Sequence, residues 1–231
     1  MSPAPTAAAA PARSDQYLER AYALSGTAAA QRLYDEWAGA YDADNTGKGY
    51  ASPRRCVEAV IRHLPPSSPP SSPPTTSTKQ LRILDAGCGT GLVGASLSRS
   101  ALAGRFALDG VDLSAGMLAV AAAKGVYRDL RTADLNAGIE GGDGSYDVVM
   151  CVGTLTKAHV GPGVLVEFAR LTAKGGLVAA TVHDEVWESG GYRAEVERLR
   201  DVGVVEVVST EAFGILEEAS TGGRMVVLRK N

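Results

Sequence analysis

Short apolar runs alternate with longer, alanine-rich segments of helical pattern from Leu81 to the end of the chain. Apolar runs of about four to eight residues, bounded by glycine or polar residues, are typical of buried strands. We expect strands near residues 81–85, 105–111, 128–132, 146–152, 175–182, 204–209 and 223–229. The alternation predicts an α/β, Rossmann-like, doubly wound fold with a seven-stranded, mostly parallel sheet.

The last two expected strands differ from the others in how they are connected. Residues 211–223 lie between them, and a parallel crossover needs about a dozen residues or more, usually with a helix. The segment leaves no room for a full crossover helix. We therefore expect the last two strands to pair antiparallel, which gives an antiparallel last strand and a sheet that is mixed at one edge.

The part of the chain before residue 80 has a different pattern. Residues 15–64 read as helices broken by glycine and proline near residues 47–53, and we expect them to form a lid within the same structural domain as the core at 80–231. Low-complexity segments at 1–14 and 65–79 predict a disordered tail and a Pro/Ser-rich linker or loop. Because no acid precedes Asp15, a transit peptide stays an alternative for the tail.

Composition and charge exclude several classes of function. The chain has 231 residues, of which 45% are hydrophobic and 21% charged, and its net charge is -3. No apolar run approaches the ~20 residues of a membrane span, and no dense Lys/Arg block favours binding to a phosphate backbone. We expect a cytoplasmic protein, monomer or dimer, that binds neither membrane nor nucleic acid.

The three cysteines, Cys56, Cys88 and Cys151, are isolated along the chain. They form no CxxC pair and no even disulfide framework. We therefore expect no metal site and a reducing compartment.

The first expected strand, LRILD, runs into the glycine-rich segment AGCGTGLVG. Such a turn brings a ligand close to the backbone at the start of a helix. Gly89, Gly91 and Gly94 match the dinucleotide pattern GxGxxG, whereas Asp85, Gly87, Gly89 and Gly91 match the adenosylmethionine pattern DxGxGxG. A turn that only packs a helix onto a sheet is the third interpretation.

Spacing favours the adenosylmethionine pattern, because it uses every residue from the end of the strand onward. The dinucleotide pattern would leave residues 85–88 unused between the strand and the first glycine. An acid at the strand end also favours a cationic sulfonium and ammonium group over a pyrophosphate. We therefore predict S-adenosyl-L-methionine as cofactor, bound by Asp85, Gly87, Cys88, Gly89 and Gly91.

Two acids further along the chain fit the same cofactor. Asp112 follows the second strand, where an acid can accept the ribose hydroxyls; capping of the next helix is the alternative, although Ser114 is the better cap. Asp134 follows the third strand and can accept a hydrogen bond from the adenine amino group. The alternative is that it forms hydrogen bonds only within its own turn. We expect Leu113, Met117 and Leu135 to form the apolar walls around the base.

These motifs resemble the class I S-adenosylmethionine-dependent methyltransferases and, more closely, the methyltransferase-like proteins of the Williams-Beuren syndrome region. The similarity covers about residues 33–230 and is carried by LYDEWAGAYDADN (33–45), GY (49–50), ILDAGCGTG (83–91), VDLS (111–114), YDVVMCVGTLTKAHV (146–160), GGLVAATVHDEVWESGGY (175–192) and MVVLRK (225–230). The resemblance implies a seven-stranded sheet with a reversed last hairpin, adenosylmethionine as methyl donor, and a small or undefined acceptor. The Pro/Ser insertion departs from the pattern but precedes the first strand.

Aromatic residues recur on one face of the expected N-terminal helix. Tyr34, Trp37 and Tyr41 are spaced at i, i+3 and i+7. They form either part of a core or a lid whose rings contact the sulfonium. We expect Trp37 and Tyr41, with Tyr50 from the following break, to reach the cofactor.

The end of the fourth strand is the expected place of the acceptor, because ligands of doubly wound sheets bind at the carboxyl ends of the strands. We assign Cys151 to the cofactor, and Gly153, Thr154 and His159 to the substrate. His159 is also the candidate catalytic base. A base is needed only if the acceptor loses a proton, and His183 and Asp184 are alternatives.

The sequence thus predicts an S-adenosylmethionine-dependent methyltransferase that transfers a methyl group by in-line displacement to a small-molecule acceptor. A protein methyltransferase or cofactor-binding regulatory module is one alternative, and an NAD-dependent oxidoreductase is another. The acceptor atom, whether sulfur, nitrogen, oxygen or carboxylate, stays open.

Overall fold

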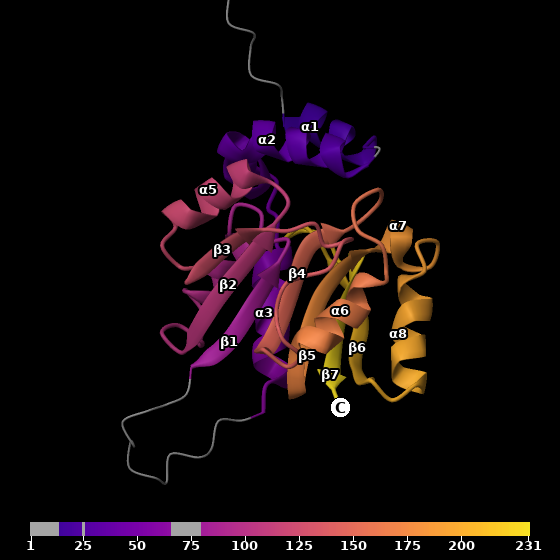
Figure 1. Ribbon diagram of the computed structural model, residues 1–231. Helices are drawn as coiled ribbons and strands as arrows, with labels where there is room; N and C mark the ends of the chain where they lie inside the picture. The colour runs from indigo at the N-terminus through magenta and orange to yellow at the C-terminus, as the bar shows by residue number, and fades with distance from the viewer. Residues whose placement is uncertain (1–13, 25, 66–79) are drawn as a thin grey trace, which may run out of the picture.

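The computed structural model describes residues 14–24, 26–65 and 80–231. The expectations for the tail and for the proline-rich linker concern residues 1–13 and 66–79, which lie outside the described part of the chain. From residue 80 onward, one α/β unit contains a single twisted sheet with helices on both faces (Figure 1).

The sheet has seven strands in the order β3-β2-β1-β4-β5-β7-β6. Their bounds are β1 (Leu81–Ala86), β2 (Phe106–Asp112), β3 (Asp129–Thr132), β4 (Tyr146–Leu155), β5 (Thr172–His183), β6 (Val205–Gly214) and β7 (Gly222–Lys230). β1 to β5 pair in parallel, whereas β7 pairs antiparallel with both β5 and β6. The predicted seven-stranded fold and its antiparallel last strand are confirmed.

The central strands are apolar on both faces because helices cover both. In β1, Ile83 packs in the cluster that contains Val57 and Val60 of α3 (Ser52–His63), while its neighbour Leu84 packs in the cluster that contains Phe168 of α6 (Val164–Leu171). Alternate residues of a strand point to opposite faces. Continuous apolar runs in β4 and β5 are therefore what a doubly covered parallel sheet requires.

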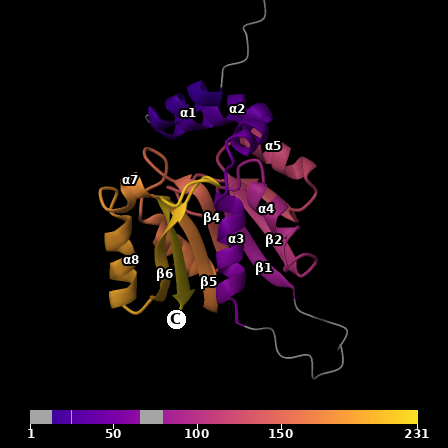
Figure 2. The same cartoon turned by 180° about the vertical axis from the view of Figure 1, so that it is seen from behind.

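Figure 2 shows α3 and α4 (Leu92–Leu97) side by side on one face of the sheet. The opposite face is covered by α6 and α8 (Tyr192–Asp201), with the short α7 (Asp184–Trp187) beside them (Figure 1). α5 (Ala115–Ala123) follows β2 and contacts both β2 and β3. The two layers leave the carboxyl ends of β1 to β5 uncovered by core helices.

Helices α1 (Ser14–Tyr22) and α2 (Thr27–Gly47) lie across that end of the sheet (Figure 1). They have a small core of their own, formed by Tyr17, Ala21, Leu33 and Trp37. The segment 15–64 thus divides in two: α1 and α2 form the cover, whereas α3 packs on the sheet. The break comes at residues 48–51, close to the glycine and proline that the sequence pattern indicated.

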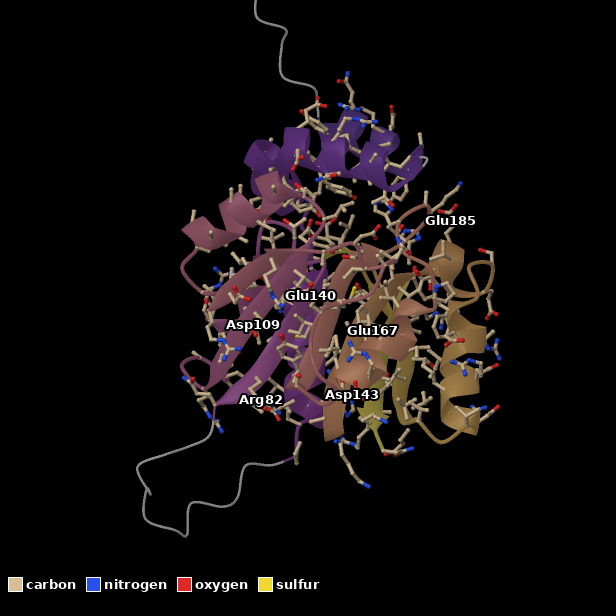
Figure 3. The ribbon with its side chains drawn as sticks, in the orientation of Figure 1. Arg82, Asp109, Glu140, Asp143, Glu167 and Glu185 are labelled. Atoms are coloured by element: carbon tan, nitrogen blue, oxygen red, sulfur yellow. The ribbon has the colours of Figure 1, made fainter. Side chains whose placement is uncertain are left out.

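Most clusters of paired charges lie away from the cover. Figure 3 shows Arg82 and Asp109 on strands, Glu167 on α6 and Asp143 on the segment between β3 and β4, all below α1 and α2. Arg82 pairs with Asp147 at 3.0 Å, and Arg170 pairs with both Asp143 and Glu167. These pairs lie toward the end of the sheet that is opposite to the cover. We assign them a structural role.

Candidate functional site

A cavity of about 340 Å³ lies between the cover and the carboxyl ends of the strands. Its floor is the turn after β1, where Gly87, Gly89 and Gly91 have φ of 73°, 52° and 89°. Residues with side chains rarely adopt such angles. A Cβ on Gly89 would meet no atom within 4 Å, whereas one on Gly87 would collide with Thr154. The backbone at Gly89 is therefore open to a ligand.

Asp112, at the end of β2, lines the cavity and closes the turn. Its two carboxylate oxygens accept the backbone N–H groups of Gly89 at 2.8 Å and Ser114 at 2.9 Å. Burial raises the pKa of this carboxyl, and the N–H groups oppose that shift. Each oxygen keeps a lone pair for a ligand hydroxyl. Ser114 is the N-cap of α5, accepting from Met117 N–H at 3.0 Å, as predicted.

The side of the cavity beyond Asp112 is mainly apolar. Leu113, Met117 and Leu135 line it, together with Asp134. One oxygen of Asp134 accepts the N–H of Asn136 at 2.9 Å, so the turn and a ligand can share this carboxylate. The structure thus brings together the residues that the sequence assigned to the ribose and the base.

The cover supplies aromatic walls. Tyr34 and Tyr41 of α2 and Tyr50 of the following turn all line the cavity. Burial raises the pKa of Tyr41 to about 12 and that of Tyr50 further, so both phenols stay protonated. Trp37 lies behind them, stacked on Tyr17 at 5.2 Å and edge-on to Tyr41 at 4.7 Å.

Two carboxylates of α2 hold the cover on the glycine turn and on α5. Asp42 accepts from the hydroxyl of Thr90 and pairs with Lys124 at 2.7 Å. Asp35 accepts the hydroxyl of Ser114 at 2.6 Å and the N–H of Gly116 at 2.9 Å. These contacts join α2 to the glycine turn and to the start of α5. Sequence analysis missed them, because no local pattern relates an acid to a partner 48 to 82 positions away.

Tyr50 is positioned by the loop that joins β6 to β7. Tyr50 forms an antiparallel bridge with Leu216, and the neighbouring Ala51 N–H donates to Ile215 at 2.8 Å. Its hydroxyl lies so close to Gly153 that any Cβ there would clash. Gly153 has a φ of 77°, so glycine is required at this point for two reasons.

His159 lies on the loop after β4, facing the cover. The hydroxyl of Tyr34 and Nε2 of His159 are 2.7 Å apart, and Nδ1 lies 2.7 Å from the carbonyl of Lys157. Burial lowers the pKa of His159, so the imidazole is neutral at neutral pH. Of the other candidate bases, His183 caps α7 by accepting Glu185 N–H at Nδ1 and also lines the second cavity described below. Asp184 lines neither cavity and pairs with Arg224 at 2.9 Å.

A second cavity, of about 390 Å³, adjoins the first. The two share five lining residues, namely Tyr34, Tyr41, Tyr50, Gly153 and His159. The second cavity extends between the cover, the end of β5 and the β6–β7 loop. Exposed Tyr22 and Leu216 lie among its lining residues. Sequence analysis had no signal for this cavity, because its walls come from five separate segments.

Beyond the shared five, nine residues assigned to cofactor or substrate line the first cavity: Gly87, Cys88, Gly89, Asp112, Leu113, Met117, Asp134, Leu135 and Thr154. Asn136 also lines it, although the sequence did not assign it. Four assigned residues do not line it: Trp37, Asp85, Gly91 and Cys151. Trp37 lines the second cavity instead, and Cys151 is buried in the sheet core.

Asp85 and Gly91 lie beneath the glycine turn. Asp85 is fully buried and accepts the hydroxyl of Tyr127 at 2.7 Å, while its other oxygen has no partner. Burial raises the pKa of Asp85 to about 7. The ring of Tyr127 also fills the space next to Gly91, where a Cβ would come within 2.9 Å of it. Both residues therefore shape the turn from below.

The cysteines are buried, and burial raises the pKa of Cys56, Cys88 and Cys151, which leaves them as unreactive thiols. Residues 14–24, 26–65 and 80–231 contain no cluster of three or more His, Cys, Asp or Glu side chains placed to hold a metal ion.

Across those same described ranges, no helix is both long and apolar enough to span a bilayer.

A seven-stranded sheet with a reversed last strand, a glycine turn after β1 and an acid at the end of β2 define the class I S-adenosylmethionine-dependent methyltransferases. Residues 83–176 match a methyltransferase domain family. Human methyltransferase-like protein 27 is 34% identical over 185 residues, which cover 77% of this chain and 69% of the human protein. The chain therefore belongs to the family of methyltransferase-like protein 27, and it is an S-adenosylmethionine-dependent methyltransferase.

Solved structures share the fold at low sequence identity. The methyltransferase crystallised in complex with the Trm112 methyltransferase activator of Haloferax volcanii has a TM-score of 0.62 and 16% identity, covering 87% of this chain and 96% of its own. Magnesium protoporphyrin IX methyltransferase of Synechocystis, solved with bound SAH (adenosylhomocysteine), has a TM-score of 0.53 and 16% identity, covering 78% and 83%. At these identities the likeness is one of fold.

Proposed function

We propose that the protein transfers a methyl group to a small-molecule acceptor by in-line displacement, with the cofactor in the first cavity and the acceptor in the second. The observation that supports this most is that the two cavities adjoin at the end of β4, sharing five lining residues. Their volumes, about 340 and 390 Å³, are in the range of pockets for small ligands.

The residues of the first cavity fit adenosylmethionine. Asp112 keeps one lone pair on each oxygen for the two ribose hydroxyls. The free oxygen of Asp134 can accept the adenine amino group, between the apolar side chains of Leu113, Met117 and Leu135. The open backbone at Gly89 accepts the amino-acid part of the cofactor without a steric obstacle. When bound, the cofactor supplies a methyl group on a cationic sulfur, which is already an activated electrophile.

The charge and aromatic character of the cavity suit a cation. Asp112 is a partly buried carboxylate, and Tyr34, Tyr41 and Tyr50 supply ring faces. A cation over an aromatic face gains about 0.5 to 2 kcal/mol. This chain's own contribution to the reaction is then to hold the acceptor in line. Orientation at near-contact distance can supply ~7 to 11 kcal/mol of the barrier.

Calorimetry with adenosylhomocysteine tests the cofactor site. We expect Asp112→Ala to weaken binding by roughly 10- to 100-fold, because it removes the acceptors for the ribose and loosens the glycine turn. Asp129→Ala is the matched control, since Asp129 is an exposed acid on the neighbouring strand that pairs with Arg131. Equal affinity in wild type and Asp112→Ala would exclude the proposed ribose site.

The nature of the acceptor is tested by incubating the protein with cell lysate and methyl-labelled cofactor. We expect label in small-molecule products that are separated from the unreacted cofactor by chromatography, and much less of this product when Asp112→Ala replaces the wild-type protein. Label confined to the protein fraction would instead support a protein methyltransferase and refute a small-molecule acceptor.

A further inference from the structure

Tyr34 and His159 form a hydrogen-bonded pair where the two cavities meet, although 125 positions separate them in the sequence. The carbonyl of Lys157 can only accept, so Nδ1 of His159 donates to it. Nε2 therefore carries the lone pair and accepts the hydroxyl of Tyr34. Burial keeps this phenol protonated by raising its pKa well above the ordinary value.

The loop that carries His159 is held in place from several directions. Asn136 donates to the carbonyl of His159 at 3.1 Å and accepts the N–H of Gly161 at 3.1 Å. The hydroxyl of Tyr192 donates to the carbonyl of Val160. Ala158, directly before the histidine, has a φ of 63°. A side-chain-bearing residue in this conformation is strained and persists only where its surroundings require it.

The second cavity differs from the first in charge. Asp112 and Asp134 line the first cavity, whereas no Asp or Glu is among the described residues that line the second, whose charged lining residue is the cation Lys48. Its walls are mostly aromatic and aliphatic, with contributions from Tyr22, Phe213 and Leu216. Burying a cation there without a carboxylate would be costly, whereas a flat, neutral, apolar molecule would be stabilised by contact with the rings.

We propose that the second cavity takes a flat, apolar acceptor with a neutral aromatic hydroxyl, and that the Tyr34–His159 pair removes its proton as the methyl group is transferred. This inference rests on the proposed function, since it names the acceptor class for the same pair of cavities. Tyr34 and His159 line both cavities, so both side chains can reach an acceptor at the junction.

The transfer is balanced in atoms and electrons. The acceptor hydroxyl donates its hydrogen bond to the oxygen of Tyr34, and the Tyr34 proton moves to Nε2 of His159 as the acceptor proton moves to Tyr34. The acceptor oxygen forms the new bond to the methyl carbon, and the electron pair of the broken carbon–sulfur bond stays on sulfur. The products are the methyl ether, the neutral thioether and an imidazolium on His159, which returns its proton to water.

Other acceptor groups fit this arrangement less well. An ammonium would bring an unpaired positive charge into the second cavity, and an ionised carboxylate has no proton for the pair to remove. A thiol is a weak hydrogen-bond donor and would bind poorly to Tyr34. A neutral hydroxyl fits the apolar cavity, and it has a proton that the Tyr34–His159 pair can remove.

The acceptor class is tested with four naphthalenes that differ only in one substituent, a hydroxyl, an aminomethyl group (an ammonium at neutral pH), a thiol or a carboxylic acid. Methylated product and adenosylhomocysteine are quantified by mass spectrometry. We expect turnover of naphthol at least roughly tenfold faster than of the other three. Preference for another substituent, or no transfer to naphthol, would overturn the proposal. If adenosylhomocysteine still binds in calorimetry, the cofactor site stands and only the acceptor class fails.

The role of the pair is tested with Tyr34→Phe, which keeps the ring and removes the hydroxyl. We expect kcat for naphthol to fall by roughly 100-fold or more with little change in KM. Turnover of a nitronaphthol that is already ionised in slightly alkaline buffer should be nearly unaffected, because that acceptor has no proton to lose. An equal fall in kcat with both acceptors would show that the hydroxyl of Tyr34 has only a structural role, and would overturn the proposed proton transfer.

Tyr17→Phe is the matched control for that experiment. Tyr17 stacks on Trp37 in the same aromatic group, and its hydroxyl lies 3.5 Å from Glu36, but it is not among the residues that line either cavity. We expect wild-type turnover of both naphthols. His159→Gln should reproduce the Tyr34→Phe pattern, and wild-type naphthol turnover in His159→Gln would also overturn the proposal.

Discussion

At the residue scale, the buried carboxyl of Asp85 shows how a motif position can shape the glycine turn from below. Its side chain points beneath the turn, to Tyr127, and one of its oxygens has no hydrogen-bond partner. Its protonated form is favoured in the folded protein because burial disfavours the charge. An unpaired lone charge at this depth costs stability at alkaline pH.

Asp85→Asn should therefore change how stability depends on pH. The pKa of Asp85 is about 7 in the folded protein against 3.8 for the ordinary group, so the native state holds a proton that the unfolded chain has released. The wild type consequently loses stability as pH rises from about 4 to 7, by at most ~1.4 kcal/mol per pH unit. Asn mimics the protonated acid and removes this loss.

Urea unfolding of the wild type and Asp85→Asn across this pH range checks the prediction. The variant should be the more stable protein above pH ~7, and the difference between the two should vanish or reverse near pH ~4. Asp129→Asn, at an exposed acid, should run parallel to the wild type at all pH values. A difference between wild type and Asp85→Asn that does not vary with pH would contradict a raised pKa.

At the element scale, the cover is attached to the core mainly through polar contacts of α2. Asp35 joins it to the start of α5 and Asp42 joins it to Thr90 and Lys124, on either side of the first cavity. The helix begins without a side-chain cap. Its position on the core therefore depends on the partners that Asp35 and Asp42 find there.

Asp42→Asn should loosen the cover over the cofactor. The lost ion pair and weakened hydrogen bond together correspond to about 1 kcal/mol, or roughly a fivefold lower affinity for adenosylhomocysteine. Calorimetry at low and high salt measures it, and the effect should shrink at high salt because Asp42 is partly exposed. Glu36→Gln, on the exposed side of the same helix, should bind like the wild type. Unchanged affinity in Asp42→Asn would show that the contact does not control closure.

At the scale of the whole molecule, the cover and the core have separate hydrophobic clusters. Only four residues form the buried cluster of α1 and α2, whereas the clusters on the two sheet faces are far larger. A region with few buried apolar contacts opens at lower free energy than the core. The two tryptophans report on the two parts, Trp37 in the cover and Trp187 in α7.

We expect the cover to unfold before the core. In the Trp187→Phe variant, Trp37 is the remaining tryptophan. Its fluorescence should change at a lower urea concentration than the far-ultraviolet circular dichroism signal, which reports on the whole chain. Saturating adenosylhomocysteine should bring the two transitions together, because its cavity is lined by both α2 and the strand ends. Coincident transitions without ligand would show that cover and core form one cooperative unit.

The sequence alone was sufficient for the sheet and for the position of the glycine turn after β1. Apolar runs such as VVMCV and LVAATV, glycines at positions of positive φ and acids at strand ends are local signals, because each reflects the conformation or burial of its own segment. The antiparallel last strand followed from the length of one connection. Asp112 and Ser114 were likewise placed correctly at the end of β2 and the start of α5.

Only the tertiary structure decided which side of the turn each residue faces and which distant residues meet. Tyr34, Trp37 and Tyr41 share one helical face, yet Trp37 lies behind the other two because Tyr17 stacks on it. The meeting of Tyr34 with His159 depends on how a separate pair of helices docks on the sheet. Helical and strand periodicity act within a segment, whereas docking depends on shape and charge contributed by many segments at once, and a single sequence does not display that.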